Sequence, residues 1–151
     1  MAINTKKIII IRFDTGDTHG IGHATRSLKI ARELNSDNNV ILSCNLKTKK
    51  LFNIKNFKTI FKKKHENESA FMIRSTKNFH KATIVIDKIY SYSANTIKKI
   101  TNNCNKLIFI QNHNSKINSE NTVILPSEHF SKLEVSKLKK KTKKVFFGKK
   151  Y

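Results

Sequence analysis

The chain has 151 residues, enough for one domain with its own core, and 38% of them are hydrophobic. Its 31 Lys and Arg residues against 10 Asp and Glu give a formal net charge of +21. The apolar run at residues 8–11 is far too short to span a membrane, and Cys44 and Cys104 form neither a metal-ligand spacing nor a disulfide framework, so we expect a cytoplasmic protein.

A continuous β-branched run predicts a buried strand at residues 7–13, and a polar loop at 14–20 leads to a predicted helix at 21–34. Beyond an Asn-rich loop, apolar runs and helical patterns alternate. In order, they predict a strand at 40–44, a short helix at 46–54, a strand at 57–61, a helix at 67–79, a strand at 82–87, a helix at 91–101 and strands at 106–111 and 122–125. A lysine-rich stretch, 131–144, and a short apolar piece, 145–147, follow.

Strands that alternate with helices favour right-handed βαβ units. We therefore expect an α/β fold: a Rossmann-like parallel sheet with helices on both faces, covering residues 1–130, and then a Lys-rich C-terminal segment, 131–151. Ligands of such sheets bind at the carboxyl ends of the strands. Three polar loops should meet there, at residues 14–23, 87–92 and 111–114.

The first of these loops carries the most specific pattern. Gly20 and Gly22 stand where the loop becomes the helix, and His23 lies in its first turn. A helix start presents unpaired N–H groups and favours an anion, and glycine lets a ligand approach the backbone closely. The residues alone thus predict an anion-binding loop with a candidate base beside it.

The same stretch resembles the amino-terminal signature of a sugar-nucleotide family. This family is the UDP-sugar hydrolases of pseudaminic acid synthesis, related to the lipid-linked N-acetylglucosaminyltransferase of peptidoglycan assembly, with the two-domain glycosyltransferase B architecture. The matching motifs are Arg12-x-Asp14, Gly20-x-Gly22-His23-x-x-Arg26, Leu28-x-x-Ala31, Ile84-Val85-Ile86-Asp87, Leu107-Ile108-Phe109-Ile110 and Gly148-x-x-Tyr151. The resemblance implies that this chain is equivalent to the first domain of that architecture.

The resemblance assigns His23 as the general base that deprotonates the attacking water or acceptor hydroxyl, a task suited to imidazole near neutral pH. Asp14 is expected either to orient His23 or to bind a sugar hydroxyl; a loop carboxylate that pairs with Arg12 or Arg26 is the alternative. Arg26 is expected to hold the loop or to help neutralise a diphosphate.

The remaining substrate contacts come from the same resemblance. Gly20, Ile21 and Gly22 would face the diphosphate, and Asp87 would contact the sugar. The family has Asp-x-Tyr after its fourth strand, whereas this chain has Asp87-Lys88-Ile89-Tyr90 with Tyr92 beyond, so either Tyr90 or Tyr92 takes that place. No cofactor and no metal is implied.

The second domain of this architecture holds most of the nucleotide. The resemblance therefore implies a UDP-linked amino sugar as substrate, a second domain or a partner chain that completes the site, and residues 131–151 as the truncated connection to it.

The charge leaves a different class of function open, a non-catalytic basic α/β domain that binds nucleic acid or an acidic surface. The excess is mostly Lys, with few Arg for bidentate phosphate contacts, so nucleic acid is the less favoured partner. The lysines beyond residue 131 also favour peripheral contact with an anionic membrane.

Overall fold

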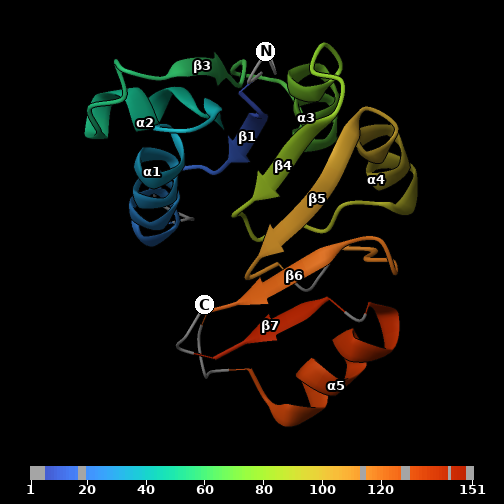
Figure 1. Ribbon diagram of the computed structural model, residues 1–151. Helices are drawn as coiled ribbons and strands as arrows, with labels where there is room; N and C mark the ends of the chain where they lie inside the picture. Colours follow the sequence, from blue (N-terminus) through green and yellow to red (C-terminus); the bar gives the residue numbers. More distant parts are fainter. Residues whose placement is uncertain (1–5, 17–19, 113–114, 127–129, 143, 149–151) are drawn as a thin grey trace, which may run out of the picture.

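A computed structural model describes residues 6–16, 20–112, 115–126, 130–142 and 144–148. Seven parallel strands form one sheet in the order β3-β2-β1-β4-β5-β6-β7 (Figure 1). The strands are β1 (Ile8–Arg12), β2 (Asn39–Cys44), β3 (Lys58–Phe61), β4 (Ala82–Ile86), β5 (Cys104–Ile110), β6 (Thr122–Leu125) and β7 (Val145–Phe147). The helices are α1 (Gly22–Leu34), α2 (Leu46–Leu51), α3 (Glu68–Thr76), α4 (Ala94–Thr101) and α5 (Lys132–Lys141). The predicted Rossmann-like α/β fold is confirmed.

The order of the strands reverses at β1. The chain runs outward from β1 to β3, then returns to place β4 on the other side of β1. Right-handed crossovers that run in opposite directions put their helices on opposite faces. Two core clusters follow this rule, one containing Leu28 of α1, the other containing Met72 of α3, Ile97 of α4 and Leu138 of α5.

Side-chain caps fix where four of the helices begin. Asn45, Asn67, Ser93 and Ser131 each accept a hydrogen bond from a backbone N–H of the following turn, and Ser131 forms a capping box with Glu134. The cap at Ser93 explains why α4 starts three residues later than predicted. Helix α1 differs, because its N-cap residue is Ile21 and no side chain caps it.

The lysine-rich residues beyond 130 take part in the same fold. Helix α5 buries Val135 and Leu138 against the sheet, and β7 pairs in parallel with β6. The sheet thus continues past the predicted boundary at residue 130. That this segment also leads to a second domain stays a prediction.

The helices built by the described ranges are all too short or too polar to cross a membrane.

Candidate functional site

The neighbouring strands β1 and β4 meet at the point where the strand order reverses, and polar residues follow both. The N–H of Asp87 donates to the carbonyl of Arg12 at 2.8 Å, so the two strand ends are joined directly. In open α/β sheets, the crevice at such a reversal is the usual ligand site. Two clusters of charged side chains occupy this edge, one around Asp87 and one around Arg12.

His23 and Asp87 form a pair at the start of α1. His23 Nδ1 lies 2.7 Å from Asp87 Oδ1; the histidine side chain is 16% exposed and the aspartate is fully buried. Two groups compete for Nδ1: the Asp87 carboxylate, which can only accept, and Arg26 Nη2 at 3.2 Å, which can only donate. We assign the imidazole proton to Nδ1, because the contact with Asp87 is the shorter one. Nε2 is then the ring nitrogen whose lone pair can take a proton from a ligand.

Two further side chains hold Asp87 in place. Arg26 donates from Nε to Oδ2 at 2.8 Å and from Nη2 to Oδ1 at 2.5 Å, and Ser27 donates to Oδ2 at 3.1 Å. Arg26 Nη2 also donates to Gln111, a residue of positive φ just after β5. Burial by itself raises the pKa of Asp87, but the hydrogen bonds from Arg26 and His23 outweigh it and lower the pKa below its ordinary value.

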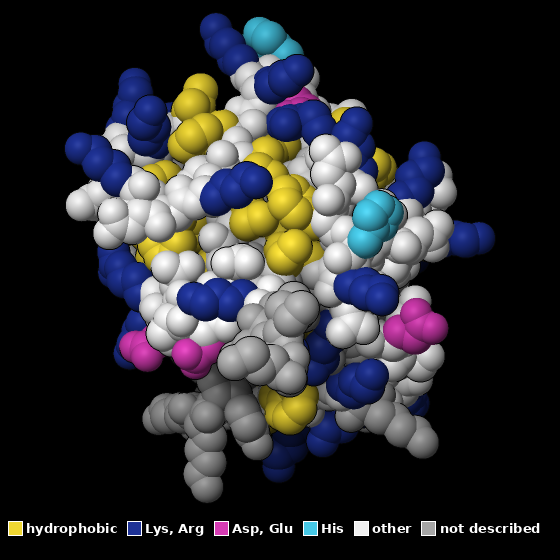
Figure 2. Space-filling view, turned by 45° about the horizontal axis from the view of Figure 1, so that its top comes forward, with side chains coloured by type: hydrophobic (Ala, Val, Ile, Leu, Met, Phe, Trp, Pro, Cys, Tyr) yellow, Lys and Arg dark blue, Asp and Glu magenta, His cyan; other side chains and the backbone are white. Residues whose placement is uncertain are grey.

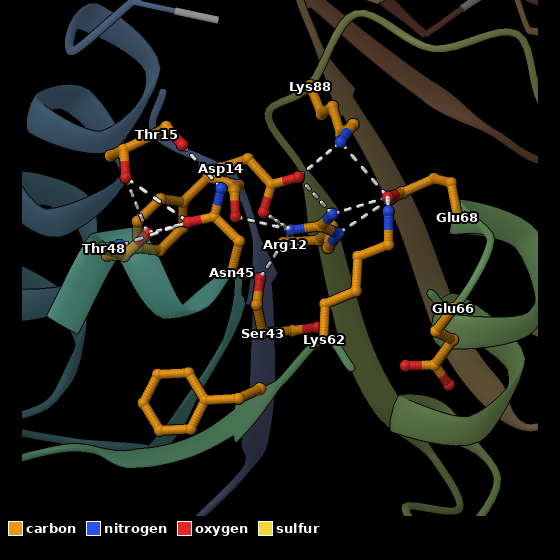
Figure 3. A network of polar contacts seen from close by, with 12 residues as sticks. Arg12, Asp14, Thr15, Ser43, Asn45, Thr48, Lys62, Glu66, Glu68 and Lys88 are labelled. Atoms are coloured by element: carbon orange, nitrogen blue, oxygen red, sulfur yellow. Dashed lines mark hydrogen bonds and ion pairs between the residues drawn. The ribbon is translucent and has the colours of Figure 1, made fainter. Parts of the chain in front are cut away.

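The second cluster surrounds the guanidinium of Arg12, which is fully buried. Arg12 donates to both oxygens of Asp14, at 2.5 and 2.6 Å, and to both oxygens of Glu68, at 2.8 and 2.6 Å. Lys88 Nζ contacts Asp14 and lies 3.2 Å from Glu68 Oε2. Figure 3 shows Arg12 between the two carboxylates, with Lys88 and Lys62 approaching Glu68 from different sides.

This cluster keeps its carboxylates charged. Burial raises the pKa of Glu68, but hydrogen bonds and charge from Arg12 and Lys88 bring the pKa down to about 2. The pKa of Asp14 is likewise lowered by Arg12 and Lys88 against the effect of burial. Two buried cations thus face two buried carboxylates, the arrangement that a low-dielectric site requires.

The structure separates the two acidic residues that the sequence placed near His23. Asp87 contacts His23, whereas the contacts of Asp14 are to Arg12 and Lys88. The contact with His23 that was expected of Asp14 is therefore made by Asp87, and Asp14 pairs with Arg12, one of the two partners that the alternative named. Asp14 also lines a cavity that Thr15, Asn45 and Lys88 line with it.

The loop after β4 gives its two tyrosines different surroundings. Tyr92 is fully buried and donates its hydroxyl proton to Glu68 Oε1 at 2.7 Å. Tyr90 is half-buried and packs edge-on against the Tyr92 ring, with the centroids 4.7 Å apart. Asn112 and Ser115 hold this loop through hydrogen bonds to the Tyr90 carbonyl. Of the two, Tyr90 is the one with surface that a ligand can reach.

Ile21 and the glycines on either side of it are open to solvent. Gly20 has φ of +61°, a conformation that favours glycine, and neither Gly20 nor Gly22 has an atom within 4 Å of where a Cβ would stand. Ile21 between them is 64% exposed. Among the described residues, these three therefore leave room for a ligand.

Several members of the two clusters lie outside the predicted motifs. Glu68 begins a helix 56 residues after Arg12, and Lys88 is a lysine that composition alone places on the surface. Two features of the sequence could have indicated these residues. Lys88 directly follows Asp87, and an arginine in a strand predicted to be buried, Arg12, needs an acidic partner. Residues 17–19 and 113–114 of the predicted loops lie outside the described residues.

Within the described ranges, no three His, Cys, Asp or Glu side chains gather into a group that could hold a metal ion. Comparison of the chain with protein-family models, with curated proteins and with solved structures gave no match.

Proposed function

We propose that the chain is one half of a sugar-nucleotide enzyme that acts on a UDP-linked amino sugar, by hydrolysis or by glycosyl transfer, with His23 as general base. The observation that carries this proposal is the 2.7 Å contact between His23 Nδ1 and the buried Asp87. A base that is oriented through one ring nitrogen and accepts a proton on the other is the arrangement that general-base chemistry needs.

In the proposed step, Nε2 of His23 takes a proton from water or from an acceptor hydroxyl. The oxygen forms a bond to the anomeric carbon, while the bond from that carbon to the diphosphate breaks and UDP leaves with its electron pair. Asp87 stabilises the imidazolium that forms, since its carboxylate stays ionised beside Nδ1.

The neighbouring residues take supporting roles in this proposal. Arg26 positions Asp87, because its Nε and Nη2 are both engaged by that carboxylate. Gly20, Ile21 and Gly22 face the diphosphate, supported by their exposure and by the uncapped start of α1. Tyr90 contacts the sugar from the loop after β4.

The site of a glycosyltransferase B enzyme is completed by a second domain. We infer that a second domain or a partner chain supplies most of the nucleotide contacts here. Four large apolar side chains support an interaction surface at or near this edge, because each is more than half exposed: Ile21, Leu46, Leu51 and Ile89.

The proposal is tested by UDP release from a UDP-linked amino sugar, assayed with the chain and, if the chain alone is inactive, with the coding sequence that neighbours it co-expressed. His23→Gln should abolish release, while His80→Gln, at an exposed histidine, should leave it unchanged. Equal release by His23→Gln and the unaltered chain would reject His23 as the base.

A second candidate, a basic domain that binds nucleic acid or an acidic surface, has one supporting observation. Figure 2 shows Lys and Arg side chains scattered around apolar side chains on the described part of this face, with few acidic ones among them. Their wide spread, without a single stripe, favours weak electrostatic attraction over a dedicated groove. Binding to DNA or RNA that ignores His23 and vanishes at high salt would support this candidate.

A further inference from the structure

A cavity of about 510 Å³ lies beside the Arg12 cluster, apart from His23. Five lysines and a single carboxylate are among its lining residues, and we call it the lysine cavity. The charged lining residues are Asp14, Lys47, Lys62, Lys63, Lys64 and Lys88. Its volume falls in the range of small-molecule sites.

The inner wall of the lysine cavity is rigidly built. Lys88 is 6% exposed and its Nζ is held between Asp14 and Glu68. Thr15, also buried, receives a hydrogen bond on its carbonyl from Asn45 Nδ2. These contacts fix the floor of the cavity without any ligand, so a ligand does not have to order it.

The carboxylate in the wall does not cancel the charge of the lysines. Asp14 is already engaged on both oxygens by Arg12, and Glu68 behind it accepts from Arg12 as well (Figure 3). Arg12 and Lys88 thus balance Asp14 and Glu68. The charges of Lys63 and Lys64 come in addition to this balanced set.

A small turn presents Lys63 and Lys64. The N–H of Glu66 donates to the Lys63 carbonyl, and the Lys63 N–H donates back to the Glu66 carboxylate at 3.1 Å. The same carboxylate accepts from Arg74 at 2.6 and 2.8 Å, which lowers the pKa of Glu66 to about 2. The acid next to the lysine run is therefore bound to Arg74.

We propose that the lysine cavity binds the phosphate group of a small ligand, with Lys62, Lys63 and Lys64 on one side and Lys88 at the floor. A concave site with excess positive charge concentrates anions, and lysine is a common point-charge ligand for phosphate. The site lies at the carboxyl end of the sheet, where ligands of this fold bind. This proposal does not rest on the chemistry assigned to His23.

Inorganic pyrophosphate is the probe, titrated calorimetrically at constant ionic strength. Lys63→Gln with Lys64→Gln should weaken its binding by about tenfold, the combined effect of two exposed ion pairs of ordinary strength. The matched control is Lys139→Gln with Lys140→Gln, in the exposed lysine run at the end of α5, which removes the same charge elsewhere. The control should bind pyrophosphate as the unaltered chain does.

Two results would overturn the proposal: equal weakening by both pairs of substitutions, or no saturable binding by the unaltered chain. The His23→Gln chain should keep its affinity for pyrophosphate. The proposal for the lysine cavity and the proposal for His23 are therefore tested independently of each other. Vesicles of phosphatidylcholine with phosphatidic acid then identify the source of the phosphate. Vesicle binding lost with Lys63 and Lys64 indicates a lipid headgroup, and vesicle binding unaffected by them indicates a soluble ligand.

Discussion

Asp87 Oδ1 accepts from His23 Nδ1 and Asp87 Oδ2 accepts from Arg26 Nε, so one buried carboxylate joins an imidazole to a guanidinium. Each oxygen has a second donor, Arg26 Nη2 for Oδ1 and Ser27 for Oδ2. The ring of His23 is consequently held by a carboxylate whose own orientation is fixed by Arg26 and Ser27.

The first prediction concerns Asp87→Asn. The amide can place an N–H toward His23 and no longer stabilises an imidazolium, so UDP release should fall roughly a hundredfold or more. Asp37→Asn, at an exposed aspartate between α1 and β2, is the control and should keep full activity. Unchanged release by Asp87→Asn would show that Asp87 does not assist His23.

The second prediction concerns the stability provided by Arg12. Arg12→Met should lower the free energy of unfolding by about 3–5 kcal/mol, because Asp14 and Glu68 would remain buried without their main partner. Urea denaturation measures this change. Arg32→Met, at an exposed arginine of α1, should alter stability by less than about 0.5 kcal/mol; similar losses in the two variants would contradict the prediction.

The third prediction concerns the pH dependence of stability. The pKa of Glu68 is about 2 in the folded chain and 4.5 ordinarily, so the unfolded chain binds the proton first as the pH falls. The stabilising contribution of Glu68 is therefore complete above about pH 5 and is lost as the pH falls from 4.5 toward 2. Urea denaturation over this range should show a steep decrease, and Glu68→Gln should make it shallower.

The fourth prediction separates the two tyrosines. Tyr92→Phe leaves Glu68 Oε1 without one of its donors and should cost about 1–2 kcal/mol of unfolding free energy. Tyr90→Phe should be nearly neutral for stability and, if Tyr90 contacts the sugar, should raise KM for the UDP-sugar. Thermal unfolding measures the stability of both variants, and steady-state kinetics measures their KM. A stability loss in Tyr90→Phe together with a raised KM in Tyr92→Phe would contradict the prediction.

Much of the fold could be predicted because its signals are local. Strand β1 begins with the continuous apolar run 8–11 and β4 ends with the continuous apolar run 84–86, and a carboxylate follows the end of each strand within two residues. The alternation with helices then leads to a parallel sheet, whose reversal brings these two strand ends together.

The pairing of side chains at this edge could not be predicted in the same way. Asp14 and Asp87 both follow strands that end side by side, and nothing local shows which of them turns toward α1. The choice depends on Arg12, whose guanidinium engages Asp14 and so leaves Asp87 for His23 and Arg26. Glu68 of α3 also binds this guanidinium, although it lies 56 residues away in the sequence. Such a contact cannot be inferred from local sequence.

Lys88 belongs to the Arg12 cluster and Asp87 to the His23 pair, yet a single peptide bond connects them. The cation at the floor of the lysine cavity and the carboxylate that aligns His23 are therefore supplied by consecutive residues directly after β4.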